Sequence, residues 1–229
     1  GLKSLDFLVV QDIFLTETAQ LADVVLPAAC FAEKEGTFTN TERRVQKVRK
    51  AVAPPGSALP DWQAIAALAS RMGYEMNYPD AEAIFKEISA VTPSYAGMDY
   101  QRLDAGGLQW PCPTKEHPGT KYLHKDKFVR GKGLFHGIEW IPPAEPVDDQ
   151  YPFLLTTGRV LYQYHTGTMT RRSVGLNERY SECLVEINTE DAARLNIKDL
   201  DTVKLVTRRG EMQAKARVGE MTEEGTIFV

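Results

Sequence analysis

The sequence has few of the residues that build metal centres. Its three cysteines lie far apart, so no CxxC pair exists and the chain cannot supply the four thiolates of an iron–sulfur cluster. Its four histidines show no metal-ligand spacing either. An odd and sparse cysteine count is typical of reduced thiols, which favours a cytoplasmic setting. The cysteines are Cys30, Cys112 and Cys183.

Two further absences exclude whole classes of function. The formal net charge is −4, whereas a nucleic-acid-binding protein needs a basic surface. No stretch approaches the ~18 consecutive apolar residues of a membrane-spanning helix. The 229 residues suit one or two domains, and their composition is that of an ordinary globular chain. Because the chain lacks an initiator methionine and stops within an apolar run at 225–229, we expect it to be part of a longer subunit.

The stretch from Leu5 to Pro27 predicts one crossover unit of an open α/β sheet. A short apolar run at 5–10 predicts a buried parallel strand that ends before polar residues. A second short strand is predicted at 23–27, closed by proline. Helical spacing between the two strands predicts a helix, so the order is strand, helix, strand. The residues with that spacing are Phe14, Thr18, Leu21 and Ala22.

Gln11 and Asp12 follow the first predicted strand. In open α/β sheets, ligands lie just past the carboxyl ends of the strands. A carboxylate at that place can accept hydrogen bonds from an amino-purine edge or from ribose hydroxyls. The alternative is a solvated loop or a cap for the following helix. The residues alone therefore predict a ligand site at Gln11 and Asp12 and leave the ligand open.

Two helices are predicted in the remainder of the first half. Residues 61–73 have an apolar face, Gly73 ends the helix, and Asp61 is a candidate N-cap. A second helix is predicted at 80–91, with Ala83, Ile84, Ile88 and Val91 inward. Residues 37–39 are predicted to be extended, and 51–57 to form a loop. Many Gly and Pro residues between 92 and 146 indicate loops and a linker.

A second, β-rich domain is predicted from about Tyr151. Strands are expected at 153–156, 184–187, 202–206 and 211–218, and Gly210 marks a hairpin between the last two. Thr189 is expected to cap a short helix that ends at Leu195. Short strands, tight turns and one helix predict a small β-barrel.

The loop from Thr157 to Arg172, TGRVLYQYHTGTMTRR, is the most polar-rich in the chain. Gly158 allows a ligand to approach the backbone closely, and Arg159 offers a five-donor fork suited to pyrophosphate or carbonyl oxygens. Threonines and tyrosines add hydroxyl groups. His165 could donate to a ligand, but for this residue taken alone a hydrogen-bonded loop histidine is the favoured interpretation.

The segments QDIFLTETAQLADVVLP and EKEGTFTNTERRVQ together resemble the dimethyl sulfoxide reductase family of molybdenum and tungsten enzymes. Within that family, the likeness to formate dehydrogenase catalytic subunits is strongest, and QWPC at 109–112 is similar to these enzymes in particular. The resemblance implies an α/β Rossmann-like, partial domain with its linker at 1–147. It also implies a truncated double-psi β-barrel domain at 148–229, to which INTEDAARLNIKDLDTVKLVTRRG is similar.

The same resemblance implies a cofactor, bis-molybdopterin guanine dinucleotide with molybdenum or tungsten. It implies that Asp61 forms a hydrogen bond with the guanine of the cofactor. The alternative role for Asp61 is that of a helix cap. In the related periplasmic nitrate reductases a lysine matching Lys34 touches the nucleotide, although a lone lysine is otherwise a surface residue. The Arg43–Arg44 pair is interpreted as a solvated or ion-paired face, with a phosphate clamp as the alternative. The implied cofactor-binding residues are Gln11, Asp12, Thr16, Lys34, Asp61, Thr157, Gly158, Arg159, Val160, Leu161, Tyr162, Gln163, Tyr164, His165 and Thr166.

By this resemblance the metal ligand, the [4Fe-4S] cluster and the catalytic His and Arg all lie upstream of this chain. We therefore assign no catalytic or metal-binding residue to it. The expected activity of the parent enzyme is the oxidation of formate to carbon dioxide, with electron-transfer subunits as partners. Alternatives are a nitrate reductase, the non-catalytic iron–sulfur scaffold of NADH:quinone oxidoreductase, and a free-standing binding module. The retained polar residues at 11, 12, 61 and 157–166 argue against the scaffold.

Overall fold

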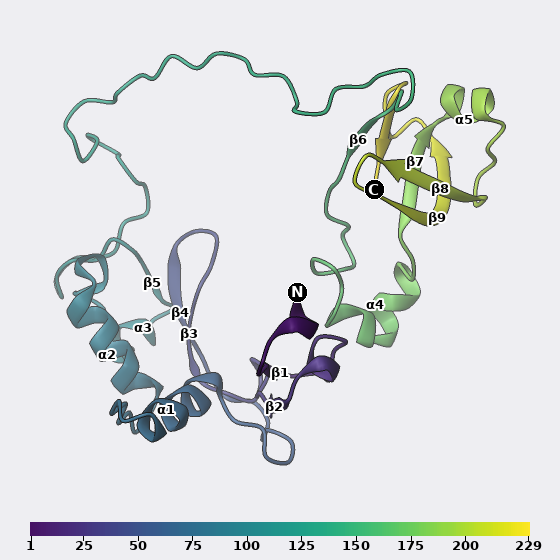
Figure 1. Cartoon of the computed structure of the whole chain (residues 1–229). Coiled ribbons are helices and arrows are strands. Elements are labelled where there is room, and N and C mark those ends of the chain that lie inside the picture. Colours follow the sequence, from purple (N-terminus) through teal and green to yellow (C-terminus); the bar gives the residue numbers. More distant parts are fainter. The chain divides into compact units, whose positions relative to one another are not determined.

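The computed structural model describes all residues, 1–229, and divides them into two compact units, 1–134 and 135–229 (Figure 1). Each unit has its own hydrophobic core and is described by itself. None of the helices has the length and apolar character needed to cross a membrane.

The first unit opens with two short parallel strands, β1 (Val9–Asp12) and β2 (Val24–Pro27). The parallel pairing was predicted, but three features of the prediction were wrong. The first strand is shifted, so that Gln11 and Asp12 are its last two residues. It is exposed or half-buried, because in this chain only one partner strand flanks it. The expected helix is a single 3-10 turn at Ala19–Leu21, too short to bury an apolar stripe.

Helix α1 (Asp61–Arg71) begins directly beside this pair of strands. A parallel bridge joins Ala28 to Leu59, and the Leu59 amide donates to the Pro27 carbonyl at 3.2 Å. The helix was predicted correctly, including its end before Gly73, whose φ of +85° suits glycine. The predicted cap was wrong: Pro60 is the N-cap, and the Asp61 side chain makes no capping bond.

A three-stranded antiparallel sheet forms the other part of this unit. Its strands are β3 (Gly36–Thr39), β4 (Arg44–Val48) and β5 (Leu108–Gln109), in the order β3-β4-β5. Three helical segments lie between β4 and β5 in the chain after α1: α2 (Ala81–Val91), Pro93–Tyr95 and α3 (Tyr100–Leu103). The core between them consists of Val45, Phe85, Met98, Leu103 and Cys112.

The buried face of α2 differs from the predicted one. Ala81, Phe85 and Ser89 are buried, whereas Ile88 and Val91 are exposed. Phe85 stacks at an angle on Tyr100 with ring centroids 5.7 Å apart. Apolar residues lie on two overlapping faces of α2. The contact between Phe85 and Tyr100 determines which of the two faces is buried.

Two arginines organise the irregular segment at 110–121. Arg43 donates to the carbonyls of Trp110, Thr120 and Lys121. Arg102 donates to the Gly97 carbonyl and, at 2.6 Å, to the carbonyl of His117. The prediction that Arg43 belongs to a solvated face is therefore wrong. Its guanidinium group holds together a loop whose carbonyls have no strand partners.

The second unit contains a five-stranded mixed sheet in the order β6-β10-β7-β9-β8 (Figure 1). The strands are β6 (Leu154–Thr156), β7 (Leu184–Asn188), β8 (Thr202–Thr207), β9 (Gly210–Gly219) and β10 (Thr226–Phe228). The predicted strands and the β8–β9 hairpin are present. The short helix α4 (Val174–Arg179) was not predicted.

Helix α5 (Thr189–Leu195) covers β7, and the cap at its start was misassigned by one residue. Asn188 is the N-cap, and its side-chain oxygen accepts from the Glu190 amide at 2.9 Å. The core below consists of Val185, Ile187, Ala192 and Ala216. In this chain β6 and β8 form the two edges of the sheet, so the predicted small β-barrel is present only in part.

Candidate functional site

Three of the predicted site residues converge on one carboxylate. Gln11 Nε2 donates to Asp61 Oδ1 at 2.9 Å, and the Lys34 ammonium is hydrogen-bonded and ion-paired with Asp61 Oδ2. These residues are separated by 50 and 27 positions along the chain. The Asp61 side chain keeps 47% of its exposure, so a ligand can reach it from solvent.

Parallel strand ends explain why these residues meet. Gln11 lies near the carboxyl end of β1, beside Leu26 of β2. The bridge at Leu59 continues the parallel order, so Asp61 emerges at the same edge two residues later. Lys34 comes from the turn after β2, where the Cys30 amide donates to the Glu33 carboxylate at 2.9 Å. The edge is therefore the place where parallel α/β sheets commonly bind ligands.

The surroundings of Asp61 favour its charged form. Partial burial by itself raises the pKa of this carboxyl, but the hydrogen bond and charge of Lys34 and the hydrogen bond from Gln11 outweigh burial. The net pKa of Asp61 therefore lies below its ordinary value. An ionised carboxylate only accepts hydrogen bonds, so the group suits a ligand edge that presents N–H or O–H donors.

Asp12 and Thr16 make only local hydrogen bonds. Asp12 Oδ1 accepts from the Phe14 amide at 2.9 Å, and Thr16 Oγ1 accepts from the Ala19 amide at 3.2 Å. Both therefore stabilise the connection between the parallel strands β1 and β2, and neither is joined by a hydrogen bond to the Asp61 cluster.

The polar loop after β6 is anchored by Gln163, which is 5% exposed. Its Nε2 donates to the Tyr180 carbonyl at 2.8 Å, and its Oε1 accepts from the Thr170 hydroxyl. Both polar atoms of this side chain thus serve the loop itself. Sequence reasoning did not identify Thr170 and Tyr180 as anchors, because no local pattern links them to Gln163.

Gly158 packs against an aromatic ring. A Cβ at this position would lie 2.6 Å from Cε2 of Phe228 and 2.7 Å from its Cζ. The Gly158 amide also donates to the Val229 carbonyl at 3.2 Å. Close packing with β10 therefore requires glycine here, independently of any ligand.

The side chains on the outside of the loop are available to a ligand. Arg159, Thr157 and Thr166 are exposed, and the guanidinium of Arg159 has no hydrogen bond or ion pair in the structure. His165 has a φ of +52°, and its ring meets Tyr164 edge-on with centroids 4.5 Å apart. Leu161 and Tyr162 are also exposed, and Val160 is half-buried. The loop therefore presents a cation and several hydroxyl groups to solvent.

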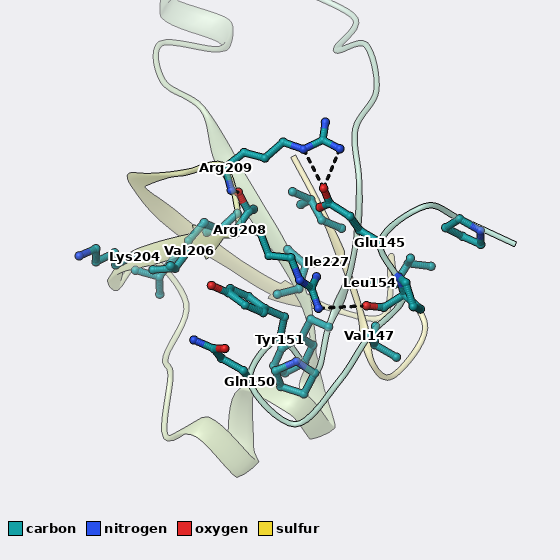
Figure 2. A pocket seen from close by; sticks show the side chains of 18 of the residues that line it. Glu145, Val147, Gln150, Tyr151, Leu154, Lys204, Val206, Arg208, Arg209 and Ile227 are labelled. Atoms are coloured by element: carbon teal, nitrogen blue, oxygen red, sulfur yellow. Dashed lines mark hydrogen bonds and ion pairs between the residues drawn. The ribbon is translucent and has the colours of Figure 1, made fainter.

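A separate cavity of about 660 Å³ in the second unit is lined mainly by residues between 143 and 155 and by strand β8 with its following turn (Figure 2). Its apolar wall includes Leu154, Val206 and Ile227, and it contains none of the predicted cofactor residues. Two arginines of the β8–β9 turn lie at its outer wall. Arg209 pairs with Glu145 at 2.7 Å (Figure 2). Arg208 pairs with Asp148. Since these charges are already paired, the cavity lacks a free ionic group at its rim, and we do not assign the cofactor to it.

Comparison with protein families gives two matches. Residues 1–71 match a model described as "Molybdopterin oxidoreductase". Residues 153–229 match a model described as "Molydopterin dinucleotide binding domain". The two matches include all the predicted site residues, one group in each.

Individual proteins show the same likeness. The "F420-dependent formate dehydrogenase subunit alpha" of Methanocaldococcus jannaschii is 58% identical over 233 residues, which cover 100% of this chain and 35% of that protein. The "Assimilatory nitrate reductase catalytic subunit" of Bacillus subtilis is 41% identical, with 100% of this chain and 34% of that protein covered. This chain thus spans about a third of the length of the curated relatives it matches.

A solved structure supports the fold. Acetylene hydratase from Pelobacter acetylenicus aligns with a TM-score of 0.65 and 21% sequence identity, covering 99% of this chain and 33% of that one. At this identity the likeness concerns the fold alone.

Proposed function

Because this chain belongs to the molybdopterin oxidoreductase family, we propose that it is the cofactor-binding portion of a formate dehydrogenase catalytic subunit. The observation that carries this proposal is the convergence of Gln11, Lys34 and Asp61 at one sheet edge. A half-exposed, ionised carboxylate with an amide beside it fits the donor edge of a guanine base. The residues present therefore fit a molybdopterin guanine dinucleotide.

Each unit contributes its own group of proposed cofactor-binding residues. Gln11, Asp12, Thr16, Lys34 and Asp61 form the guanine end. Residues 157–166 bind the pterin or pyrophosphate, with the unpaired fork of Arg159 directed at oxygen atoms of that group. Gln163 and Gly158 act indirectly, since the first fixes the loop and the second lets it pack on Phe228. The assignment of these residues to the cofactor is ours.

The finer fold assignment is part of the same proposal. We propose that residues 1–147 belong to a Rossmann-like domain and residues 148–229 to a double-psi β-barrel. The parallel β1–β2 pair and the mixed five-stranded sheet support the two assignments. Further strands from a longer polypeptide would complete both sheets.

Formate is the proposed substrate of the parent enzyme. The relative named for formate dehydrogenation is 58% identical, against 41% for the nitrate reductase, and both alignments cover the whole chain. The reaction converts formate to carbon dioxide, one proton and two electrons, and the bound metal cofactor supplies that redox chemistry. This chain's own residues bind and orient the cofactor, and we assign no catalytic residue to it. Nitrate reduction remains the second candidate, favoured by the nitrate reductase match.

Further features of the parent enzyme follow by the same inference. We propose molybdenum or tungsten as the metal, a [4Fe-4S] cluster bound elsewhere in the subunit, and electron-transfer subunits as partners. A cytoplasmic location agrees with the sparse cysteines. The three cysteines are free here and form no metal cluster with neighbouring side chains.

The test replaces Asp61 and Arg159 separately by alanine in the longer subunit that contains this chain. Each change removes a charge-assisted hydrogen bond worth about 1.5–3 kcal/mol, or roughly a 10- to 150-fold loss in cofactor affinity. Metal per subunit, measured by elemental analysis, should fall in parallel with formate oxidation.

The matched control is Asp104→Ala, which removes an ion-paired aspartate on the same unit, bonded to Lys47 and Arg49. It should leave metal content unchanged. Full metal content in both the Asp61 and Arg159 variants would contradict the assignment of these residues to the cofactor.

A further inference from the structure

The ammonium group of Lys34 is paired with a carboxylate and is not free in solvent. Its side chain is 26% exposed, and its ammonium bonds Asp61, whose neighbouring oxygen accepts from Gln11. No other anionic side chain bonds Lys34 in the structure. A lysine at a nucleotide site commonly contacts a phosphate group. Here the ammonium group of Lys34 instead bonds Asp61, the residue proposed to hydrogen-bond the base.

The two bonds fix the orientation of the Asp61 carboxylate. Gln11 holds one oxygen and Lys34 holds the other. A carboxylate has about four lone-pair sites, so two remain for a ligand. Without Lys34, the Asp61 side chain can rotate, and its anionic form loses a charge-assisted hydrogen bond.

We propose that Lys34 is a positioning residue that orients Asp61 for base recognition and makes no contact with the ligand's phosphate. This inference rests on the proposed function, in which Asp61 accepts hydrogen bonds from a guanine edge. The oriented, ionised carboxylate accepts two adjacent N–H donors of one base. A base that presents an acceptor at that place, such as adenine, meets an unfavourable acceptor–acceptor contact. Lys34 thereby determines base selectivity as well as affinity.

The role predicts a particular pattern across ligands. A phosphate-binding lysine stabilises guanosine monophosphate and leaves guanosine, which has no phosphate, unaffected. A lysine that orients Asp61 contributes equally to both ligands. The two roles are therefore separated by ligands that differ by one phosphate group, without any redox assay.

The experiment titrates guanosine, guanosine monophosphate and adenosine into the 229-residue chain, with affinity measured by ligand-observed NMR. Lys34→Met and Lys34→Gln should each weaken both guanine ligands by the same factor, about tenfold. The preference for guanosine over adenosine should shrink. Lys34→Arg, which keeps the charge, should recover part of the loss.

Two controls complete the design. Lys47→Met removes a lysine that pairs with Asp104 on the same unit and should leave all affinities unchanged. In an Asp61→Asn background, Lys34→Met should cause no further loss, because the group it orients is already altered. Amide NMR spectra of each variant establish that the unit is folded.

The outcomes distinguish this inference from the proposed function. If Lys34→Met and Lys34→Gln weaken guanosine monophosphate alone, Lys34 is a phosphate contact and the inference is wrong, while the nucleotide site stands. The inference is also wrong if the losses caused by Lys34→Met and Asp61→Asn are additive. If the unsubstituted, folded chain binds neither guanine ligand, the nucleotide site itself is refuted and the inference with it.

Discussion

Gly158→Ala tests whether the glycine of the polar loop serves packing or ligand approach. The added methyl carbon would lie 2.6 Å from the Phe228 ring, well inside van der Waals contact. Real Cβ atoms essentially never come this close, so the ring or the loop must shift. Phe228 belongs to β10, which pairs with β6 on one side and β7 on the other, so its freedom to move is small.

The expected cost follows from overpacking. Inserting a methyl group into a packed position typically costs about 1–3 kcal/mol in the free energy of unfolding. Phe228 is half-buried and near the sheet edge, so we expect a value at the lower end, about 1–2 kcal/mol. In urea this corresponds to a midpoint lower by roughly 0.5–1 M at the usual slope for small domains.

The assay is urea unfolding of the 229-residue chain, followed by amide NMR signals of β6 and β10. These signals report on the second unit alone, as the chain has two compact units. Signals from the first unit serve as an internal control and should keep their midpoint. The double variant with Phe228→Leu removes the ring atoms that the methyl group would meet.

The double variant decides between the two roles. If packing is the reason for glycine, Gly158→Ala should cost less in the Phe228→Leu background than alone, a coupling of about 1 kcal/mol. If Gly158→Ala leaves the stability within about 0.5 kcal/mol of the parent chain and yet abolishes cofactor retention in the longer subunit, the packing explanation is wrong.

Two further predictions concern buried and half-buried aspartates. Asp191 is fully buried and accepts a hydrogen bond from the Gly225 amide at 2.7 Å. Asp191→Ala leaves that amide without an acceptor and should therefore lower the free energy of unfolding of the second unit by about 1–3 kcal/mol. An unchanged urea midpoint for the NMR signals of β10 would contradict this. The lowered pKa of Asp61 means that its contribution to stability is present above the unfolded-state pKa and is lost as the pH falls through the folded-state pKa. Carboxyl NMR titration should place the Asp61 pKa below the ordinary value, and Lys34→Met should raise it; a lower pKa in that variant would refute the ion pair's effect.

The elements that sequence predicted well are those with local signals. The apolar spacing of α1, the hairpin before Gly210 and the parallel strand at 24–27 are all present. Cap positions were wrong by one residue at Pro60 and Asn188, because a local pattern places the start of a helix only to within one or two residues. The helix expected between β1 and β2 is a single turn, since local spacing cannot provide the packing that stabilises a short helix.

The sequence by itself determined the family likeness, the helices α1, α2 and α5, the strands β6 to β9, and the two groups of polar residues in which a cofactor site was predicted. These follow from motifs and periodicities that lie within short stretches of the chain. Tertiary structure alone decided which of those residues meet. Lys34 and Asp61 are 27 positions apart and Gly158 is distant from Phe228, so each contact depends on how strands align, which no local pattern specifies. Lys34, which the family likeness places at the nucleotide, pairs with the Asp61 carboxylate because the parallel strand ends bring both groups to one edge.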